Sequence, residues 1–217
     1  MSSQSQIMSG YYSWQSSIYG ATRWSFLFDR GAIIDDMQLA SGATVIEVGC
    51  GTGHNLEGIL KRIGPTGEII AVDCSTPMIE RCSTRIRAKG WKNVRLLDQE
   101  YGRTPVTDGG VDAVLLSYSL SMIPDWEQTL ECALGELKPG GRIGVVDFCL
   151  EERNLATLRF AYWMARNRVR LDRPYREKLG LLFRRLRCVT RRAPGSLWSF
   201  YRFVGERRLQ DNLIKIS

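Results

Sequence analysis

Residues 44–53 constrain the fold more than any other stretch, and they read Thr-Val-Ile-Glu-Val-Gly-Cys-Gly-Thr-Gly. The first half is a β-branched apolar run, which is typical of a strand buried on both faces. Three glycines follow at alternate positions, Gly49, Gly51 and Gly53. Glycine has no Cβ, so the chain can turn tightly there and a ligand can lie against bare backbone. Because residues 54–63 carry apolar side chains at helical spacing, the stretch predicts a strand, a ligand-binding loop and a helix in an α/β sheet.

An acidic residue stands where such a fold would use one. Residues 68–72 form a second apolar strand that ends in Asp73, 24 residues after Gly49. An acid at the tip of the second strand can accept hydrogen bonds from both hydroxyls of a ribose. The strict alternation of the glycines, and Glu47 inside the first strand, distinguish the pattern from a dinucleotide-binding fingerprint.

Taken together, these motifs resemble those of class I S-adenosylmethionine-dependent methyltransferases. Two later features agree with the resemblance: Asp98 closes a third apolar strand over 94–97, and Leu-Lys-Pro-Gly-Gly at 137–141 precedes a strand over 142–146. The resemblance covers roughly residues 40–150. It implies an α/β Rossmann-like fold, with a mostly parallel seven-stranded sheet and helices on both faces, and S-adenosylmethionine as cofactor. The alternative is a glycine-rich turn in another doubly wound fold.

The resemblance also suggests a contact for each part of the cofactor. Glu47 would hydrogen-bond the loop or the cofactor's ammonium group, and the backbone N–H groups of residues 49–53 would bind its carboxylate. Asp73 would hold the ribose and Asp98 the adenine amino group, while Met78 would lie against adenine or belong to the core. The candidate cofactor-binding residues are Tyr12, Arg23, Glu47, Gly49, Gly51, Gly53, Asp73, Cys74, Met78, Asp98, Gln99 and Ser117.

Length and composition predict a single domain. The chain has 217 residues, of which 44% are apolar, and this is enough for one substantial core. We interpret residues 1–40 as an aromatic lid, 41–150 as the cofactor-binding core, and 151–217 as a basic region that caps the substrate and closes the sheet. The first ten residues do not resemble a signal peptide, and no stretch approaches about 20 uninterrupted apolar residues. We therefore expect a cytoplasmic protein, with peripheral membrane contact as an addition.

The six cysteines show neither a CxxC pair nor the spacing of metal ligands. We therefore expect reduced thiols and no metal site. Cys50 and Cys74 flank the glycine loop and are interpreted as small packing residues.

Charge is unevenly distributed along the chain. Residues 1–150 have 13 Lys and Arg against 17 Asp and Glu, whereas residues 151–217 have 17 against 6, a net charge of +11. A basic C-terminal third favours an anionic membrane surface or an acidic substrate, with nucleic acid the less favoured partner. The alternative is a solvated, arginine-rich helical face. Oligomeric state is not indicated.

The rest of the chain alternates between helices and strands. We expect helices over 77–89, 126–137, 155–170 and 176–186, a fourth strand over 111–117, and a final strand over 196–204 that pairs beside the fifth. Because ligands gather at the carboxyl ends of parallel strands, Asp73, Asp98, Ser117 and Tyr118 should share one rim of the sheet.

Aromatic residues are the most suitable catalytic candidates. Alkyl transfer from a sulfonium depends on alignment and desolvation more than on acid–base help, and aromatic faces stabilise such cations. The dense aromatic stretch over 11–30 is predicted to cover the cofactor, or to pack as a helix pair on the sheet edge. Tyr19, Tyr118 and Tyr175 are the candidate catalytic residues, with Trp14, Trp163 and Tyr201 as further aromatic candidates. The single histidine, His54, is better placed for capping or packing than for base catalysis.

Segments outside the core make the resemblance narrower. The aromatic stretch over 11–28, Ser-Tyr-Ser-Leu-Ser-Met-Ile-Pro-Asp-Trp at 117–126, and residues 169–179 are similar to betaine-lipid N-methyltransferases and the related bacterial phosphatidylethanolamine N-methyltransferases. This resemblance implies methyl transfer to an amine, either a small molecule or a lipid head group.

Two alternatives remain open. Gln15, Gly20 and Asn167 stand where the narrower pattern carries titratable groups. A protein of this build could instead let the methionine amine attack its own γ-carbon, which releases methylthioadenosine and closes azetidine-2-carboxylate. The second alternative is a non-catalytic S-adenosylmethionine-binding module.

Overall fold

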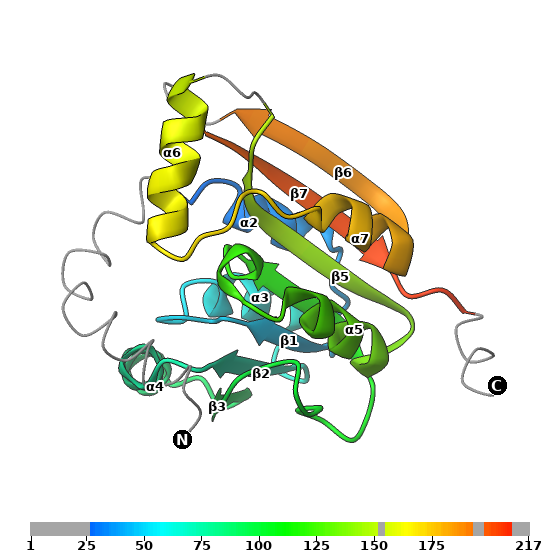
Figure 1. Cartoon of the computed structure of the whole chain (residues 1–217). Helices are drawn as coiled ribbons and strands as arrows, with labels where there is room; N and C mark the ends of the chain where they lie inside the picture. Colours follow the sequence, from blue (N-terminus) through cyan, green and yellow to red (C-terminus); the bar gives the residue numbers. More distant parts are fainter. Residues whose placement is uncertain (1–26, 152–154, 193–197, 210–217) are drawn as a thin grey trace.

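The computed structural model describes residues 27–151, 155–192 and 198–209. Within these ranges seven strands form one sheet: β1 (Thr44–Val48), β2 (Glu68–Asp73), β3 (Val94–Asp98), β4 (Val111–Ser117), β5 (Leu137–Cys149), β6 (Arg184–Arg192) and β7 (Ser199–Glu206). The helices are α2 (Arg30–Asp36), α3 (Leu56–Ile63), α4 (Thr76–Lys89), α5 (Trp126–Glu136), α6 (Leu155–Arg166) and α7 (Tyr175–Leu182), with a 3-10 turn η2 (Leu120–Met122) (Figure 1).

The strand order is β3-β2-β1-β4-β5-β7-β6. The first five strands of this order are parallel, and β7 runs antiparallel to both β5 and β6. The predicted fold class is therefore confirmed, as is a final strand beside the fifth. Since β1, β2 and β4 are parallel neighbours, their carboxyl ends meet at one edge of the sheet, where ligands of such folds bind.

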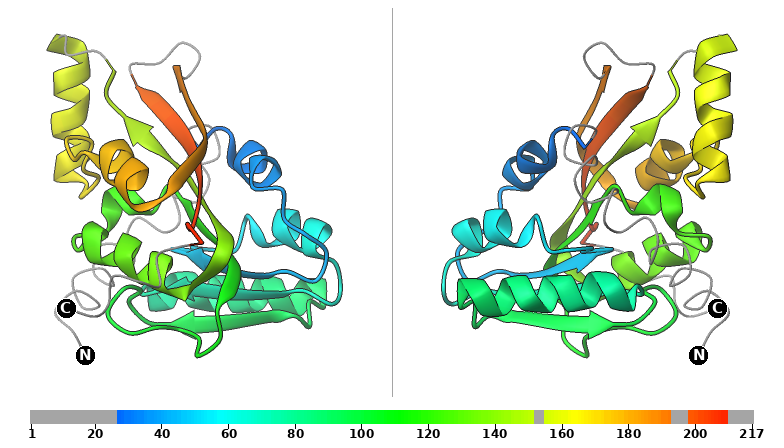
Figure 2. Two further views of the ribbon diagram at one scale, coloured as in Figure 1. Left: turned by 90° about the vertical axis from the view of Figure 1, so that its right-hand side faces the viewer. Right: turned by 90° about the vertical axis from the view of Figure 1, so that its left-hand side faces the viewer.

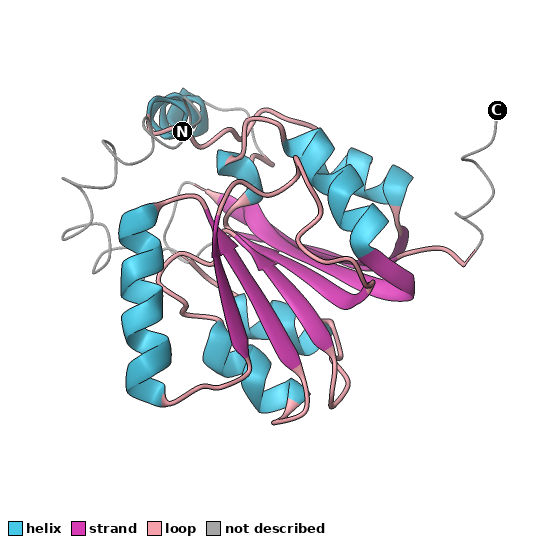
Figure 3. Ribbon diagram, turned by 90° about the horizontal axis from the view of Figure 1, so that it is seen from below, coloured by secondary structure: helices cyan, strands magenta, loops and turns pink. Residues whose placement is uncertain are grey.

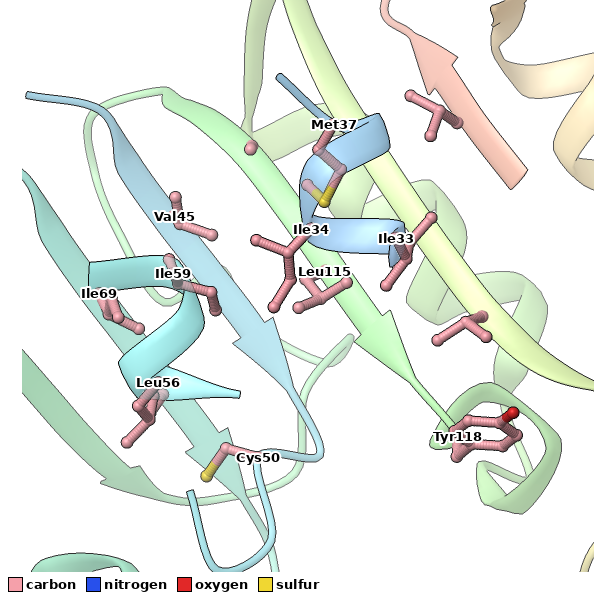
Figure 4. Close-up of a cluster of buried hydrophobic side chains, with 14 of the residues drawn as sticks. Ile33, Ile34, Met37, Val45, Cys50, Leu56, Ile59, Ile69, Leu115 and Tyr118 are labelled. Carbon is pink, nitrogen blue, oxygen red and sulfur yellow. The ribbon is translucent and has the colours of Figure 1, made fainter. Parts of the chain in front are cut away.

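Helices cover both faces of the sheet, as predicted (Figures 2 and 3). One apolar cluster joins α2, α3 and α4 to side chains such as Val45 and Leu115, and the other joins α5 and α7 to the alternate strand positions, such as Ile46 and Leu116. Figure 4 shows the first cluster, where Ile34 of α2 lies over the sheet beside Leu115. The central strands are apolar on both sides because each face is covered.

The C-terminal region differs from the predicted elements. The helix expected over 155–170 ends at Arg166, and the helix expected over 176–186 ends at Leu182. Residues 184–192 are instead the edge strand β6, which pairs along its length with β7. Arginine and leucine favour a helix locally, but the ladder with β7 outweighs that propensity.

The arginines of β6 explain part of the basic C-terminal third. Arg184 lies 2.6 Å from Glu206, and Arg187 lies 3.4 Å from Asp36. Charged side chains on an edge strand also oppose pairing with another chain. Part of the positive charge of this region therefore forms ion pairs within the fold.

A buried ion cluster holds α2 against the sheet. Arg202 of β7 is 4% exposed, and its guanidinium lies 3.2 Å from Asp29 and 3.1 Å from Asp36, at the two ends of α2. A charge this deeply buried is tolerated only when it is paired. The cluster therefore fixes α2, and with it Arg30, relative to the sheet.

We expect Arg202→Met to lower the free energy of unfolding by about 3 kcal/mol, because it removes the buried guanidinium from Asp29 and Asp36, which keep only longer contacts with the exposed Arg191 and Arg187. The matched control is Arg184→Met, whose ion pair is exposed and should contribute less than about 1 kcal/mol. Urea unfolding of both variants measures the difference. Equal losses of unfolding free energy would contradict the role of the buried ion cluster in holding α2.

Candidate active site

A pocket opens at the carboxyl edge of the sheet, between the β1 loop, the end of β2 and the segments that follow β3 and β4. The predicted residues that line it are Gly49, Gly51, Asp73, Cys74, Met78, Gln99 and Tyr118. The topology thus brings residues from four separate segments to one site, as the rule for open α/β sheets predicts.

The three glycines adopt positive φ angles, 71° at Gly49, 56° at Gly51 and 75° at Gly53, which side-chain-bearing residues rarely adopt. A Cβ at Gly49 would lie 2.5 Å from the Cβ of Ser119, so this glycine permits close approach of the β4 segment. A Cβ at Gly51 would meet nothing within 4 Å. Gly51 therefore leaves open space on the pocket side, which fits a ligand lying against bare backbone.

Asp73 is held in place by the backbone on either side of it. Its carboxylate accepts hydrogen bonds from the N–H of Gly51 at 2.8 Å and of Ser75 at 2.9 Å. Each carboxylate oxygen has two lone pairs, so acceptor capacity remains for ribose hydroxyls. The position and orientation of Asp73 fit its predicted role.

The backbone N–H groups of the glycine loop, residues 49–53, do not fit their predicted role of binding the cofactor carboxylate. The N–H groups of Gly49 and Cys50 donate to one carbonyl oxygen of β2, at 2.8 and 3.0 Å, and that of Gly53 donates to Cys50 at 3.0 Å. With Gly51 bound to Asp73, four of the five N–H groups already have acceptors within the chain. The prediction that these amides bind the cofactor carboxylate is therefore not supported.

Glu47 lies behind the loop rather than in the pocket lining. It is 1% exposed, and Asn55 donates to its Oε1 at 2.7 Å. Its Oε2 has no hydrogen-bond donor in the described part of the chain. Burial raises the pKa of Glu47 from 4.5 to about 7, against the opposing effects of Asn55 and Arg30. A buried acceptor of this kind fits either of its predicted roles, ordering the loop or receiving a cation.

Tyr118 is the one candidate catalytic tyrosine that the described residues bring to the pocket. It follows β4 with a φ of 56°, a strained conformation for a tyrosine. Its hydroxyl donates to the carbonyl of Phe28 at 2.9 Å, and its ring packs 4.7 Å from that of Phe148. Burial raises the pKa of the Tyr118 hydroxyl. The ring is therefore fixed and the phenol stays neutral.

Arg30 lies outside the pocket lining but next to two residues of the candidate site, Tyr118 and Glu47, and sequence reasoning did not indicate this position. Its guanidinium carbon lies 5.9 Å from the centre of the Tyr118 ring, and its charge lowers the pKa of Glu47. In the sequence it looks like any arginine at the start of a helix, and only the packing of α2 reveals its position. Tyr101, Arg103 and Ser119 do line the pocket, and sequence reasoning did not name them as site residues.

Tyr175 and Asp98 lie outside the pocket lining. The Tyr175 ring packs edge-on against Trp126, with centroids 4.9 Å apart, and its hydroxyl donates to the carbonyl of Arg170 at 3.1 Å. Asp98 is exposed and accepts a hydrogen bond from the Thr76 hydroxyl at 3.1 Å. Contacts within the protein account for both side chains.

Gly53, Ser117 and His54 are not in the lining either. A Cβ at Gly53 would lie 2.8 Å from the sulfur of Cys82, so this glycine serves packing between the loop and α4. Ser117 is buried at the end of β4. The Nδ1 of His54 lies 3.0 Å from Nη1 of Arg85, and burial lowers the pKa of His54 to about 4. These features agree with a packing role for the histidine.

Several predicted residues fall outside the described ranges. They are Tyr12, Trp14, Gln15, Tyr19, Gly20 and Arg23. Of the other aromatic candidates, Tyr201 is buried in the core and Trp163 is exposed on α6.

Comparison with known proteins shows which family the chain belongs to. A model of the ubiE/COQ5 methyltransferase family matches residues 25–169, which include β1 to β5 and every described segment of the pocket. The chain belongs to the ubiE/COQ5 methyltransferase family. This membership supports S-adenosylmethionine, the predicted cofactor, as the methyl donor.

Two relatives with curated names are demethylmenaquinone methyltransferases. The Staphylococcus saprophyticus protein is 33% identical over 122 residues, which are 56% of this chain and 50% of that protein. The Lactobacillus johnsonii protein is 28% identical over 119 residues, 54% of this chain and 49% of that protein. The chain thus spans about half the length of these relatives.

Solved structures of other methyltransferases share the fold. A S-adenosylmethionine-dependent methyltransferase from Aquifex aeolicus superposes with a TM-score of 0.62 at 21% identity, over 83% of this chain and 90% of that chain. Geranyl diphosphate methyltransferase in complex with S-adenosylmethionine superposes with a TM-score of 0.68 at 17% identity, over 82% of this chain and 84% of that chain. At these identities the likeness concerns the fold alone.

We expect Asp73→Ala to weaken S-adenosylmethionine binding at least about tenfold, the scale of a lost hydrogen bond to a charged group. Asp98→Ala is the matched control and should have a smaller effect, because Asp98 lies outside the pocket lining. Isothermal calorimetry measures both affinities. Unchanged affinity of Asp73→Ala for S-adenosylmethionine would show that Asp73 does not hold the ribose.

Glu47 should make stability depend on pH. Its folded-state pKa of about 7 lies above the 4.5 of the free side chain, so the folded protein keeps a proton that the unfolded chain releases. As the pH rises from 4.5 through 7, the wild type should therefore lose roughly 3 kcal/mol of stability relative to Glu47→Gln. Urea unfolding across this pH range tests the difference, and parallel curves for the two proteins would refute it.

Proposed function

We propose that this protein transfers the methyl group of S-adenosylmethionine to an amine nitrogen, on a small molecule or a lipid head group. The observation that carries the proposal is the charge of the pocket lining. Among the described residues it has three carboxylates, Asp73, Glu100 and Asp125, and one guanidinium, Arg103. Arg103 lies 2.9 Å from Glu100 and is neutralised by it. Such a lining favours a cationic sulfonium together with an amine, and disfavours an anionic acceptor.

The cofactor, when bound, supplies an electrophilic methyl group on a positively charged sulfur, which a neutral nitrogen can take in one displacement. Asp73 would hold the ribose, since its carboxylate is already oriented by two backbone N–H groups. Tyr118 would offer a fixed aromatic face to the cation. These residues would orient the reacting atoms and exclude water, which is what such a displacement requires.

Carboxylates are the groups that the pocket offers for proton transfer. No histidine or lysine is found among the described residues that line the pocket. An aliphatic amine is protonated at neutral pH, so it must release a proton before its nitrogen can attack, and water or the carboxylate of Asp125 can accept that proton. The neutral nitrogen then has the lone pair that takes the methyl group.

Other reactions are distinguishable by their products. Family membership favours methyl transfer over attack at the γ-carbon or a non-catalytic role. The names of the relatives make demethylmenaquinol the competing acceptor. Methyl transfer leaves adenosylhomocysteine, whereas γ-carbon attack leaves methylthioadenosine.

The test is incubation of the purified protein with S-adenosylmethionine alone, with phosphatidylethanolamine or free ethanolamine, and with demethylmenaquinol, followed by mass spectrometry. We expect adenosylhomocysteine only when an amine is added, and a slower reaction by Asp73→Ala at low cofactor concentration. Methylthioadenosine without an acceptor, turnover with the quinol alone, or no turnover at all would each overturn the proposal.

A further inference from the structure

Helix α6 carries large apolar side chains on its outer face. Leu155 is 69% exposed, Leu158 48%, Tyr162 66% and Trp163 57%. These four account for more than half of the large apolar side chains that the described residues leave exposed. Figures 1 and 2 show α6 (yellow) at the periphery of the molecule. A contiguous exposed group of this kind marks an interaction surface more often than scattered single residues do.

The spacing of these residues shows that the helix has two distinct faces. Leu155, Leu158 and Tyr162 recur at intervals of three and four, so they project from one side. Thr157 and Met164 project from the other side and are buried. Since the inner face already anchors the helix to the protein, the outer face is available to a partner.

Two arginines share the outer face. Arg159 and Arg166 are exposed and fall between the apolar residues on the helix surface. Neither has an ion pair with a described carboxylate, whereas Arg184, Arg187 and Arg191 of β6 lie within 4 Å of one. The charges of Arg159 and Arg166 are therefore not neutralised by ion pairs within the described part of the protein.

The segment after α6 is bonded to the pocket wall. The N–H of Arg170 donates to the carbonyl of Ser121 at 2.8 Å, and Nη1 of Arg173 donates to the carbonyl of Ile123 at 2.7 Å. Ile123 and the adjoining Met122 line the pocket. The segment that follows α6 is thus hydrogen-bonded to a segment that lines the pocket, so a partner bound to α6 would be connected to the pocket through these residues.

We propose that α6 docks the protein on an anionic lipid bilayer, lying in the plane of the membrane surface. Leu155 and Leu158 would enter the boundary of the hydrocarbon, Tyr162 and Trp163 would sit among the head groups, and Arg159 and Arg166 would meet lipid phosphates. No helix in the described ranges is long and apolar enough to cross a membrane, so the contact is peripheral. This docking does not require the acceptor to be an amine.

Other partners fit the face less well. In a symmetric pair of copies, the same face would meet itself, and the arginines of both copies would come together without a carboxylate on the face. A nucleic acid would match the arginines but would gain nothing from exposed leucines. A bilayer with anionic lipids matches both kinds of side chain at once.

The apolar part is tested by sedimentation with vesicles of equal parts phosphatidylglycerol and phosphatidylcholine. We expect Leu158→Glu combined with Tyr162→Glu to weaken partitioning at least about tenfold. The matched control is Leu181→Glu, which changes a leucine of α7 that is 72% exposed and should partition like the wild type. Thermal melting verifies that each variant is folded. Wild-type partitioning by the double variant, or an equal loss in the control, would overturn the proposal.

The charged part is tested on the same vesicles. Arg159→Gln with Arg166→Gln should weaken binding about tenfold or more, while Arg185→Gln, an exposed arginine of β6, should have a smaller effect. Wild-type binding should fade in about 0.5 M salt as the screening length shrinks. Sedimentation equilibrium without lipid covers the remaining case: a wild-type dimer that Leu158→Glu dissociates would assign the face to a second copy instead.

Discussion

The hydrogen bonds between Asp73 and the backbone are the interactions on which the site depends. One carboxylate oxygen accepts from Gly51 and the other from Ser75, so a single side chain joins the glycine loop after β1 to the turn before α4. The loop can therefore take φ angles of 56° to 75° without drifting from the rim of the sheet. If the carboxylate were lost, the loop and the turn would lose the two hydrogen bonds that connect them, and this side of the pocket would be less well fixed.

A second carboxylate does the same at the other side of the pocket. Asp147, fully buried at the end of β5, accepts from the backbone and the hydroxyl of Ser121 at 2.8 and 2.7 Å. Ser121 belongs to η2, which leads into the pocket residues Met122 and Ile123. Asp73 at the end of β2 and Asp147 near the end of β5 thus each hold a segment that lines the pocket. Both segments follow the carboxyl ends of strands, where the chain has no strand partner to fix it.

Arginines of the C-terminal third occupy different environments in the fold. Arg202 clamps α2 to the sheet from a buried position, and arginines of β6 form ion pairs along an edge strand. Arg159 and Arg166 of α6 lie beside a group of exposed apolar side chains and have no ion pair with a described carboxylate. The net charge of +11 therefore says little by itself about a partner, because the fold uses part of it, and the position of each arginine decides whether its charge is available.

The sequence alone determined the strand–loop–helix unit around the glycines and the acid after β2, because these depend on local rules of backbone freedom and hydrophobic pattern. The fold class and the cofactor followed from the resemblance of these motifs to class I S-adenosylmethionine-dependent methyltransferases. The sequence also indicated Asp73, Gly51 and Tyr118, whose places follow from their positions at strand ends. Only the tertiary structure decided that residues 184–192 form β6, since the partner strand β7 outweighs their helical preference. It likewise decided that Tyr175 packs against Trp126 while Arg30 approaches Tyr118. Contacts between segments far apart in the chain have no local signature, so these positions could not be predicted from the residues themselves.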